Sequence, residues 1–320
     1  MTSTLEIPAY FNLLRTIGIP GIIDGRQTEV DSELLRIARL NKIALLYSTA
    51  VNIDGYHKDL ILRRELLTKT LNDVCSIFNK NRIKYCIFKT IKPFPTTPSD
   101  IDVLLSQEDF GEAETLLTSS GYRKRAHDSY SSTLEKEMVV DLQLQPSVSN
   151  MPYLPRTILM QNTVIKSMNG CNVRTLSPDA ELIAIASHSF YKEQMLTLND
   201  YYAITMLAEQ VDSQQILDLA TRAKVLEVIR MVVGLCSQIT ESVFNAQLEI
   251  SKLGIDIGAS YVHPIQTMPL KFAFASIIKL LISRASKDEE MRRSVVPAII
   301  RIASPRQLRR LISHMMRSTY

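Results

Sequence analysis

The chain has 320 residues, 46% hydrophobic and 22% charged, which is long enough to bury at least one full core and excludes a disordered or fibrous protein. Its net charge of +4 is uneven, because the segment from Lys271 to Tyr320 holds eleven basic and three acidic residues. Four cysteines without a Cys-x-x-Cys pair exclude zinc ribbons and disulfide scaffolds and favour the reducing cytoplasm.

Membrane and secretion signals are missing from the sequence. The segment from Met1 to Pro8 lacks the basic start and apolar run of a signal peptide, and no stretch approaches the roughly 20 apolar residues of a spanning helix. We therefore expect a soluble, cytoplasmic protein with no transmembrane segment.

Residues 1–80 are predicted to form an N-terminal helical region. Asp31 and Ser32 can cap a helix that runs to Leu45. After a break near Gly55, the segment Lys58 to Lys80 predicts a second helix. Its apolar face contains Leu60, Leu67, Leu71, Val74 and Phe78.

Residues 81–175 are predicted to form a small α/β core, because the apolar period changes here from helical to alternating. Tyr85–Phe88, Ile101–Leu105 and Met138–Leu144 predict strands, and Phe110–Ser119 predicts an amphipathic helix. The expected order is strand, loop, strand, helix, and one or two further strands.

Residues 176–320 are predicted to form a helical C-terminal domain. Ser177 is the expected cap of its first helix and Pro178 the first helical residue, where a missing N–H does no harm. Further helices are expected at Asp200–Glu209, Ser213–Gln238, Thr240–Leu253, Leu270–Arg284 and Pro305–Met316.

Paired acids at the start of the second strand are the clearest chemical signal. Alternate residues of a strand share a face, so Asp100 and Asp102 point the same way while Ile101, Val103 and Leu105 face the core. Two acids on one face repel each other, and a cation would relieve the repulsion. Surface acids at a strand edge are also common, so the pair alone is weak evidence for a site.

A third acid follows the same pattern in the third strand. Val140, Leu142 and Leu144 are expected to face the core, and Asp141, Gln143 and Gln145 the open side. If the two strands are neighbours, three carboxylates converge. Such oxygen-rich sites suit Mg²⁺ or Mn²⁺.

The loop before Asp100 contains two lysines and four hydroxyl side chains, counting Ser99. Lys89, Thr90 and backbone N–H groups could hold phosphate there, and Lys92 and Ser99 are further candidates for nucleotide contacts.

The order of strand, loop, Ser-Asp-Ile-Asp strand, helix ending in Ser-Gly-Tyr, and Val-Asp-Leu strand resembles the nucleotidyltransferase superfamily with the polymerase-beta-type palm. More narrowly, it is similar to the uncharacterised nucleotidyltransferase-like proteins. The resemblance covers roughly residues 84–203. It implies an α+β fold, in which a small mixed sheet is flanked by helices and followed by a mostly helical C-terminal region.

The resemblance assigns roles to individual residues. Asp100, Asp102 and Asp141 would be the catalytic metal ligands, Thr90 would lie near the triphosphate-binding element, and Lys89 matches the lysine of the narrower family. Two departures stand out. Thr90 replaces the glycine expected beside Lys89, where a Cβ hinders approach of backbone to phosphate, and the prolines at 93, 95 and 98 prevent the short helix that usually follows.

His188 and Lys192 lie four residues apart in a predicted helix and so on one face, where the resemblance implies a cleft. An ordinary hydrogen-bonded role for His188 is an equal alternative. Asp200 could orient either side chain, but capping the next helix is the favoured interpretation.

The C-terminal segment alternates arginines with apolar residues. Such a helix could contact phosphates of RNA or DNA or an acidic membrane surface, but a solvated face on a packing helix is slightly favoured, because base-stacking aromatic residues are missing there. The arginines are Arg292, Arg293, Arg301, Arg306, Arg309, Arg310 and Arg317.

Several enzyme classes lack their signatures. No Gly-x-Ser-x-Gly, P-loop or dinucleotide fingerprint occurs, and the other histidines share no metal-ligand spacing. A nucleotide-sugar glycosyltransferase with an Asp-x-Asp motif is disfavoured, because its fold normally opens with a parallel α/β half.

Two hypotheses remain. The first is a nucleotidyltransferase that uses Mg²⁺ or Mn²⁺ to move a nucleotidyl group from an NTP such as ATP to a hydroxyl of RNA, a protein or a small molecule. The second is a catalytically degenerate member that serves as a nucleic-acid or protein binding module. The apolar helical stripes would also allow an oligomer.

Overall fold

A central seven-stranded mixed sheet organises the structure, a computed structural model that describes residues 8–26, 29–52, 58–148, 150–168, 170–253, 268–289 and 291–294. In the sheet, β11 runs parallel to β3 and β4 runs parallel to β7, whereas the other neighbours are antiparallel. The strand order is β10 (Thr163–Met168), β11 (Cys171–Leu176), β3 (Tyr85–Ile87), β4 (Asp100–Leu105), β7 (Val139–Gln143), β6 (Ser131–Glu135) and β5 (Arg123–His127).

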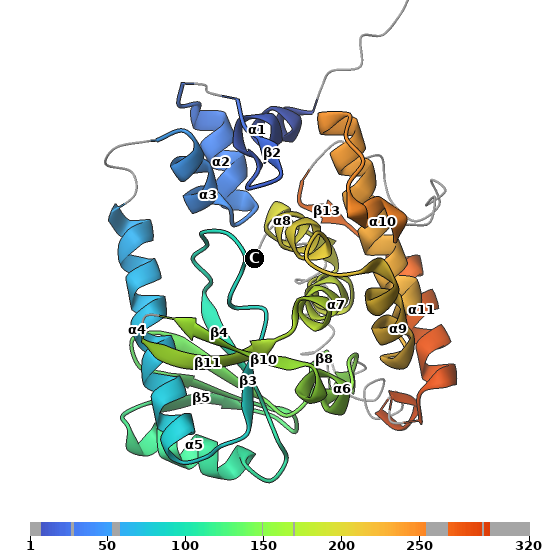
Figure 1. The fold of residues 1–320 in the computed structure, drawn as a ribbon. Helices are drawn as coiled ribbons and strands as arrows, with labels where there is room; N and C mark the ends of the chain where they lie inside the picture. The colour runs from blue at the N-terminus through green and yellow to red at the C-terminus, as the bar shows by residue number, and fades with distance from the viewer. Residues whose placement is uncertain are drawn as a thin grey trace, which may run out of the picture.

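One face of the sheet is covered by α4 (Lys58–Lys80) and α5 (Phe110–Ser119), as Figure 1 shows. Ile101, Val103 and Leu105 of β4 point to this side and join a hydrophobic cluster with Leu71 and Phe78 of α4. The amphipathic patterns that predicted these elements therefore produce this core.

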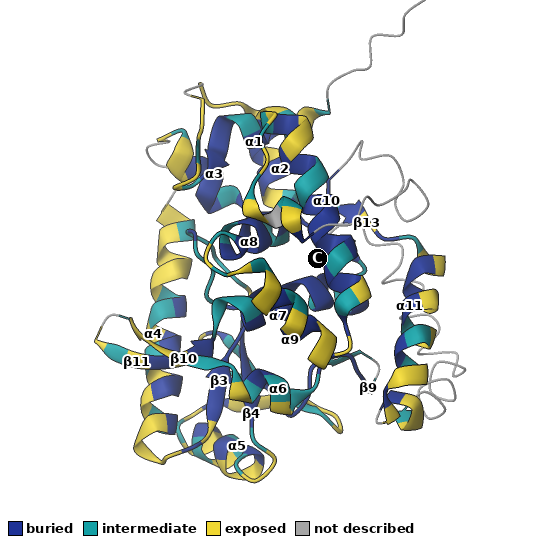
Figure 2. Cartoon of the chain, turned by 45° about the vertical axis from the view of Figure 1, so that its right-hand side comes forward, coloured by how far each residue is buried: buried dark blue, intermediate teal, exposed yellow. Residues whose placement is uncertain are grey.

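The other face is covered by α7 (Pro178–His188), on which α8 (Leu198–Ala208), α9 (Ser213–Arg222) and α10 (Leu226–Phe244) pack. The remaining described helices of the chain after β9 are α6 (Arg156–Gln161) and α11 (Phe274–Lys287). A second hydrophobic cluster joins Cys86 and Leu104 of the sheet to α7 and α8. Figure 2 shows α7 and α8 mostly buried, in contrast to the exposed outer sides of α4 and α5.

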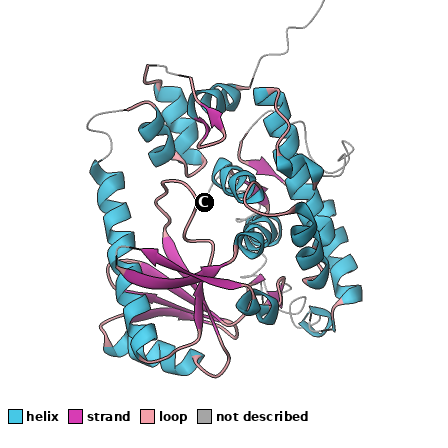
Figure 3. Ribbon diagram, in the orientation of Figure 1, coloured by secondary structure: helices cyan, strands magenta, loops and turns pink. Residues whose placement is uncertain are grey.

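The N-terminal helices pack on this helical region and not on the sheet (Figures 1 and 3). The Tyr202 hydroxyl donates to the Gly18 carbonyl at 2.9 Å, and the Asn41 side chain bridges Met268 and Leu198. These helices are α1 (Ala9–Ile17), α2 (Ser32–Leu40) and α3 (Ala44–Ala50). Short paired strands complete the described elements: β1 (Gly18–Ile19) with β2 (Ile23–Asp24), β8 (Ser147–Val148) with β9 (Met151–Pro152), and β12 (Met195–Leu196) with β13 (Leu270–Lys271).

The α+β fold with a mixed sheet and helical C-terminal region is confirmed, and α4 and α5 have the predicted bounds. Asp31 caps α2 through the N–H groups of Glu33 and Leu34 as expected. Ser177 precedes Pro178 at the start of α7, but its hydroxyl donates to the Asn162 carbonyl and does not cap the helix. The sheet also has more strands than the three or four predicted.

Two predicted helices are wrong because each is interrupted. The helix expected to reach Leu45 ends at Leu40, and the one expected over Ser213–Gln238 breaks between α9 and α10. Lys42 and Lys224 adopt left-handed backbone conformations there, with φ of 60° and 58°. The N–H groups of the following residues, Ile43 and Val225, each donate to the carbonyl five residues earlier. A helix end of this type is usually marked in the sequence by a glycine, which is absent at both positions.

Other predicted C-terminal helices differ in their bounds. Thr240 lies within α10, which ends at Phe244, and only a 3₁₀ turn at Glu249–Lys252 follows. Leu270 is in β13, and α11 begins at Phe274. The helix predicted at Pro305–Met316 and most of the arginine-rich segment lie outside the described residues.

The three-part division of the chain stays a prediction. Within the described ranges, the hydrophobic clusters join segments across its boundaries: α4 packs with the sheet, and α1 with α10. No helix among the described residues is both long and apolar enough to cross a membrane.

Candidate metal and nucleotide site

Three carboxylates converge where β4 and β7 lie side by side. Asp102 is the register partner of Asp141 in this parallel pair, and Asp100 precedes Asp102 on the same face. One carboxylate oxygen from each of the three residues lies within 4.8 Å of the others. The predicted convergence of the three acids is therefore observed.

The surroundings of Asp100 and Asp141 suit a cation. Burial, and then the charges of neighbouring aspartates, raise the pKa of both carboxyl groups above their usual range. The Oδ1 atom of Asp141 is buried and has no hydrogen-bond partner. This unpartnered buried oxygen and the two neighbouring carboxylates together form a set of oxygen ligands of the kind that binds hard divalent cations.

Asp102 is held differently. Its Oδ2 atom lies 3.1 Å from the Lys89 ammonium, and its Oδ1 atom accepts a hydrogen bond from Gln143 Nε2. Burial alone would raise the pKa of Asp102, but the positive charges of Lys89 and Lys192 outweigh it and lower this pKa. Asp102 thus already has a cationic partner within the chain.

The sequence predicted that Gln143 and Gln145 would face an open side, and this prediction is wrong. Both are buried: Gln143 contacts Asp102, and Gln145 donates to the Leu154 carbonyl at 3.1 Å. The segment around Leu154, which the alternation of β7 could not reveal, covers this side.

An unusual backbone conformation at the end of β3 places Lys89. Its φ is 58°, in the left-handed region that favours glycine, and its N–H donates to Glu181 Oε1 of α7 at 2.7 Å. Glu181 is buried, and burial raises its pKa to about 7. The buried carboxylate stabilises the turn that directs the lysine side chain toward Asp102.

The other predicted loop residues are placed less favourably for phosphate. The Thr90 hydroxyl is buried, donates to the Phe88 carbonyl and accepts the Asp102 N–H at 2.9 Å, so it ties the loop to β4. Ser99 is exposed and donates to Asp100 Oδ1 at 3.0 Å. Lys92 is half-buried and lines a separate small cavity with Glu181, where burial lowers the pKa of its amine. As expected, residues 89–99 form no helix.

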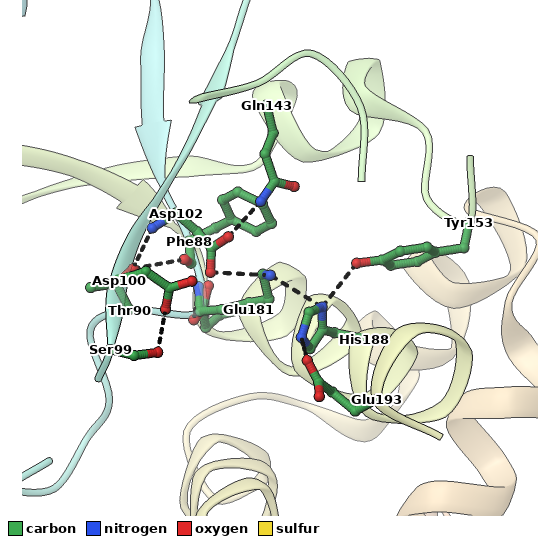
Figure 4. Close-up of polar contacts among 11 residues, drawn as sticks. Phe88, Thr90, Ser99, Asp100, Asp102, Gln143, Tyr153, Glu181, His188 and Glu193 are labelled. Carbon is green, nitrogen blue, oxygen red and sulfur yellow. Dashed lines mark hydrogen bonds and ion pairs between the residues drawn. The ribbon is translucent and has the colours of Figure 1, made fainter. Parts of the chain in front are cut away.

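His188 lies in a partly buried polar cluster with Tyr153 and Glu193 (Figure 4). Its Nδ1 atom is 3.1 Å from Lys89 Nζ and 3.0 Å from the Tyr153 hydroxyl, and its Nε2 atom is 2.7 Å from Glu193 Oε1. Burial and the nearby lysines hold the pKa of His188 well below its usual range, so the ring is neutral at pH 7. A neutral ring that donates through Nε2 can accept through Nδ1.

A π-helix over Ser189–Glu193 creates this cluster. Its wider turn brings residues five apart together, so Glu193 meets His188. Lys192, expected on the His188 face, lies close enough for its charge to act on all three aspartates: it opposes the rise in the pKa of Asp100 and Asp141 and helps to lower the pKa of Asp102. Asp200 forms a capping box with Thr197 in α8, as favoured.

Sequence reasoning missed Glu181, Tyr153 and Glu193. Glu181 stands within an otherwise apolar run, Ala180 to Ala186, and an acid in such a run was the available signal. No local pattern marks Tyr153, because it reaches His188 from a distant segment.

Residues 96–241 match the family model described as uncharacterised nucleotidyltransferase. The resemblance noted in the sequence is confirmed over this segment. No curated protein matches the chain.

Two solved structures are similar to parts of the chain. The chain is 12% identical to ANT(2″)-Ia in complex with adenylyl-2″-tobramycin, with a TM-score of 0.39 over 50% of this chain and 97% of that one. It is 14% identical to an antigenic nucleotidyltransferase-like protein from Paracoccidioides brasiliensis, with a TM-score of 0.40 over 58% and 95% of the two chains. At these values neither structure informs the substrate of this chain.

Proposed function

We propose that this protein is a metal-dependent nucleotidyltransferase that moves a nucleotidyl group from an NTP to a hydroxyl acceptor and releases pyrophosphate. The observation that carries the proposal is the convergence of Asp100, Asp102 and Asp141, with one buried carboxylate oxygen lacking a partner. The family match over residues 96–241 supports it. Four cysteines, none in a disulfide, fit a reducing compartment such as the cytoplasm.

In this reaction the acceptor oxygen attacks the α-phosphorus of the NTP. The bond between the α-phosphorus and the oxygen that bridges it to the β-phosphorus breaks, and pyrophosphate leaves. Asp100, Asp102 and Asp141 would hold Mg²⁺ or Mn²⁺, which would neutralise phosphate charge and promote ionisation of the acceptor hydroxyl. Asp141, whose pKa is raised, would accept the hydroxyl proton. Lys89 and Lys192, both close to the carboxylates, would contact the phosphates, with Ser99 at the exposed rim.

A second candidate function is a degenerate binding module. It is favoured by one observation: the Thr90 hydroxyl, which the resemblance places near the triphosphate, is fully engaged within the protein.

Calorimetric titration of the four NTPs with Mg²⁺ or Mn²⁺ separates the two functions. We expect metal-dependent binding to the wild type and none to the Asp100→Ala/Asp102→Ala variant. The Asp73→Ala/Asp128→Ala variant removes two acids outside the triad and should bind like the wild type. Absence of binding to the wild type would favour the binding module.

A further inference from the structure

The three carboxylates of the site are not equivalent, although they lie together. Asp141 has an unpartnered buried oxygen, whereas both oxygens of Asp102 accept hydrogen bonds and one of them pairs with the Lys89 ammonium at 3.1 Å. The side chain of Lys89 is only 7% exposed. A buried cation thus lies against one of the proposed metal ligands.

Two groups of contacts hold Lys89 in this position. Glu181 accepts its N–H and stabilises the left-handed backbone, and His188 Nδ1 lies 3.1 Å from its ammonium. Tyr153 and Glu193 in turn fix the His188 ring. The contacts form one chain of polar groups from Glu193 through His188 and Lys89 to Asp102.

We propose that Lys89 is a built-in counter-cation that competes with the divalent metal for Asp102, and that Glu181 is the positioning residue that holds it there. The inference rests on the proposed function, because it needs the metal site. A like charge about 3 Å from a ligand opposes metal binding, especially where little water screens it. When a metal–triphosphate complex binds, its phosphates offer the Lys89 ammonium a new negatively charged partner. Lys89 can then move from Asp102 to the phosphates.

Opposite effects on metal alone and on metal with nucleotide therefore distinguish this role from a purely structural one. Lys89→Met should bind Mn²⁺ at least about tenfold more tightly than the wild type, because the competing charge is gone. The same variant should bind Mn²⁺ with NTP more weakly, because a phosphate contact is lost. Lys80→Met removes an equal charge at the exposed end of α4 and should change neither affinity.

The experiment is calorimetric titration of MnCl₂ alone, and then of NTP with saturating MnCl₂, into each full-length variant. If the wild type binds neither, the proposed function fails. If it binds and Lys89→Met has an equal or weaker affinity for Mn²⁺ alone, Lys89 supports the metal ligand and the competition inference is overturned.

Glu181 provides a second test that does not depend on the folding of Lys89→Met. Glu181→Ala removes the acceptor of the Lys89 N–H and should also tighten Mn²⁺ binding, whereas Glu181→Gln keeps an amide oxygen there and should stay near the wild-type affinity. Equal Mn²⁺ affinity in all three proteins would exclude the positioning role.

A separate observation concerns the other end of β4. A groove of about 630 Å³ lies beside Ser106, between the end of α4, β11 and α6. Ser106 follows Asp102 by four residues, roughly 13 Å along an extended chain, so this groove is distinct from the carboxylate site.

Cations dominate the lining of this groove. Arg82, Lys84, Arg156 and Arg174 line it, with Glu108 as the acid among its lining residues. Within the part of the chain that the structure describes, no ion pair engages these four cations. Like charges gathered in a concave surface create a positive potential that attracts a partner with several negative charges.

We propose that this groove binds the phosphodiester backbone of a nucleic acid. The four cations come from three separate segments, the loop before β3, α6 and β11, and three of the four are arginines, whose guanidinium groups donate to phosphate in pairs. This spread fits a chain of phosphates better than a single one.

Fluorescence anisotropy of a labelled oligoribonucleotide at several salt concentrations tests the groove. Lys84→Glu/Arg174→Glu changes two exposed groove residues and should weaken binding at least about tenfold and reduce the slope of log K against log salt by about 1 to 2. Arg63→Glu/Arg64→Glu on the exposed side of α4 makes the same charge change outside the groove. Equal losses in both variants, or no binding by the wild type, would contradict the proposal, as would complete competition by inorganic tripolyphosphate at equal phosphate concentration.

Discussion

The two faces of β4 are both covered, yet they have opposite consequences for the protein. On one face, Ile101 and Val103 are fully buried among apolar side chains and need no partner. On the other, the buried Asp102 needs Lys89 and Gln143 to offset the loss of water. One face of the strand provides stability, and the other keeps charged groups out of water at an energetic cost.

The largest effect expected from this contrast follows from Asp102→Asn. The substitution keeps the shape but removes a negative metal ligand, so Mn²⁺ affinity should fall by more than the roughly 10- to 100-fold that loss of a supporting residue costs. Circular dichroism should show an intact fold, and calorimetry measures the affinity. Wild-type Mn²⁺ affinity in this variant would remove Asp102 from the site.

Ile101→Ala tests the opposite face. Truncation of this fully buried side chain should lower the free energy of unfolding by about 2–5 kcal/mol, because it removes apolar contacts and leaves a cavity. Urea unfolding measures the loss. Mn²⁺ affinity at a temperature where the variant is folded should be unchanged, and a large change would show that the two faces are coupled.

The sequence predicted both faces of β4, because alternation of apolar and acidic residues determines which side chains lie together. It also indicated that Asp141 would join them, since β7 repeats the pattern. β5 escaped prediction, because its charged segment, Arg123–His127, is exposed along its whole length at the edge of the sheet. The β10–β11 hairpin was also missed, although an Asn-Gly pair at 169–170 is a turn signal in the sequence.

The features that no local pattern could predict are those where the backbone departs from regular geometry. Lys42, Lys89 and Lys224 adopt left-handed conformations that sequence reasoning assigns to glycine. The π-helix changes the spacing that links His188 to its partners, so the four-residue rule pointed to Lys192 while Glu193 makes the contact. The polar cluster around Lys89 depends on these irregularities.

Glu181 gives a smaller effect that depends on pH. Its pKa is raised in the folded protein to about 7, from an ordinary 4.5, so the neutral form is favoured by folding. The stability from this group is complete below about pH 4.5 and is lost as pH rises through about 7. Glu181→Gln removes this loss and should be more stable than the wild type at pH 8, by up to about 3 kcal/mol, but not at pH 4.5. Thermal unfolding at the two pH values measures the difference, and an equal effect at both would show that Glu181 does not titrate in this range.

The smallest effect is expected from Thr90. Its hydroxyl accepts a hydrogen bond from the backbone of β4 and belongs to neither the apolar nor the acidic face of the strand. Thr90→Val keeps the volume but leaves the buried Asp102 N–H without its acceptor, which should cost about 1–2 kcal/mol of unfolding free energy. Thr90→Ser keeps the hydroxyl and should retain most of this energy. If Thr90→Val also binds Mn²⁺ with NTP as the wild type does, the hydroxyl serves to fix β4 beneath the carboxylates. If nucleotide binding is lost in Thr90→Val and kept in Thr90→Ser, the hydroxyl exchanges its internal partners for a phosphate, as the resemblance to active nucleotidyltransferases implies.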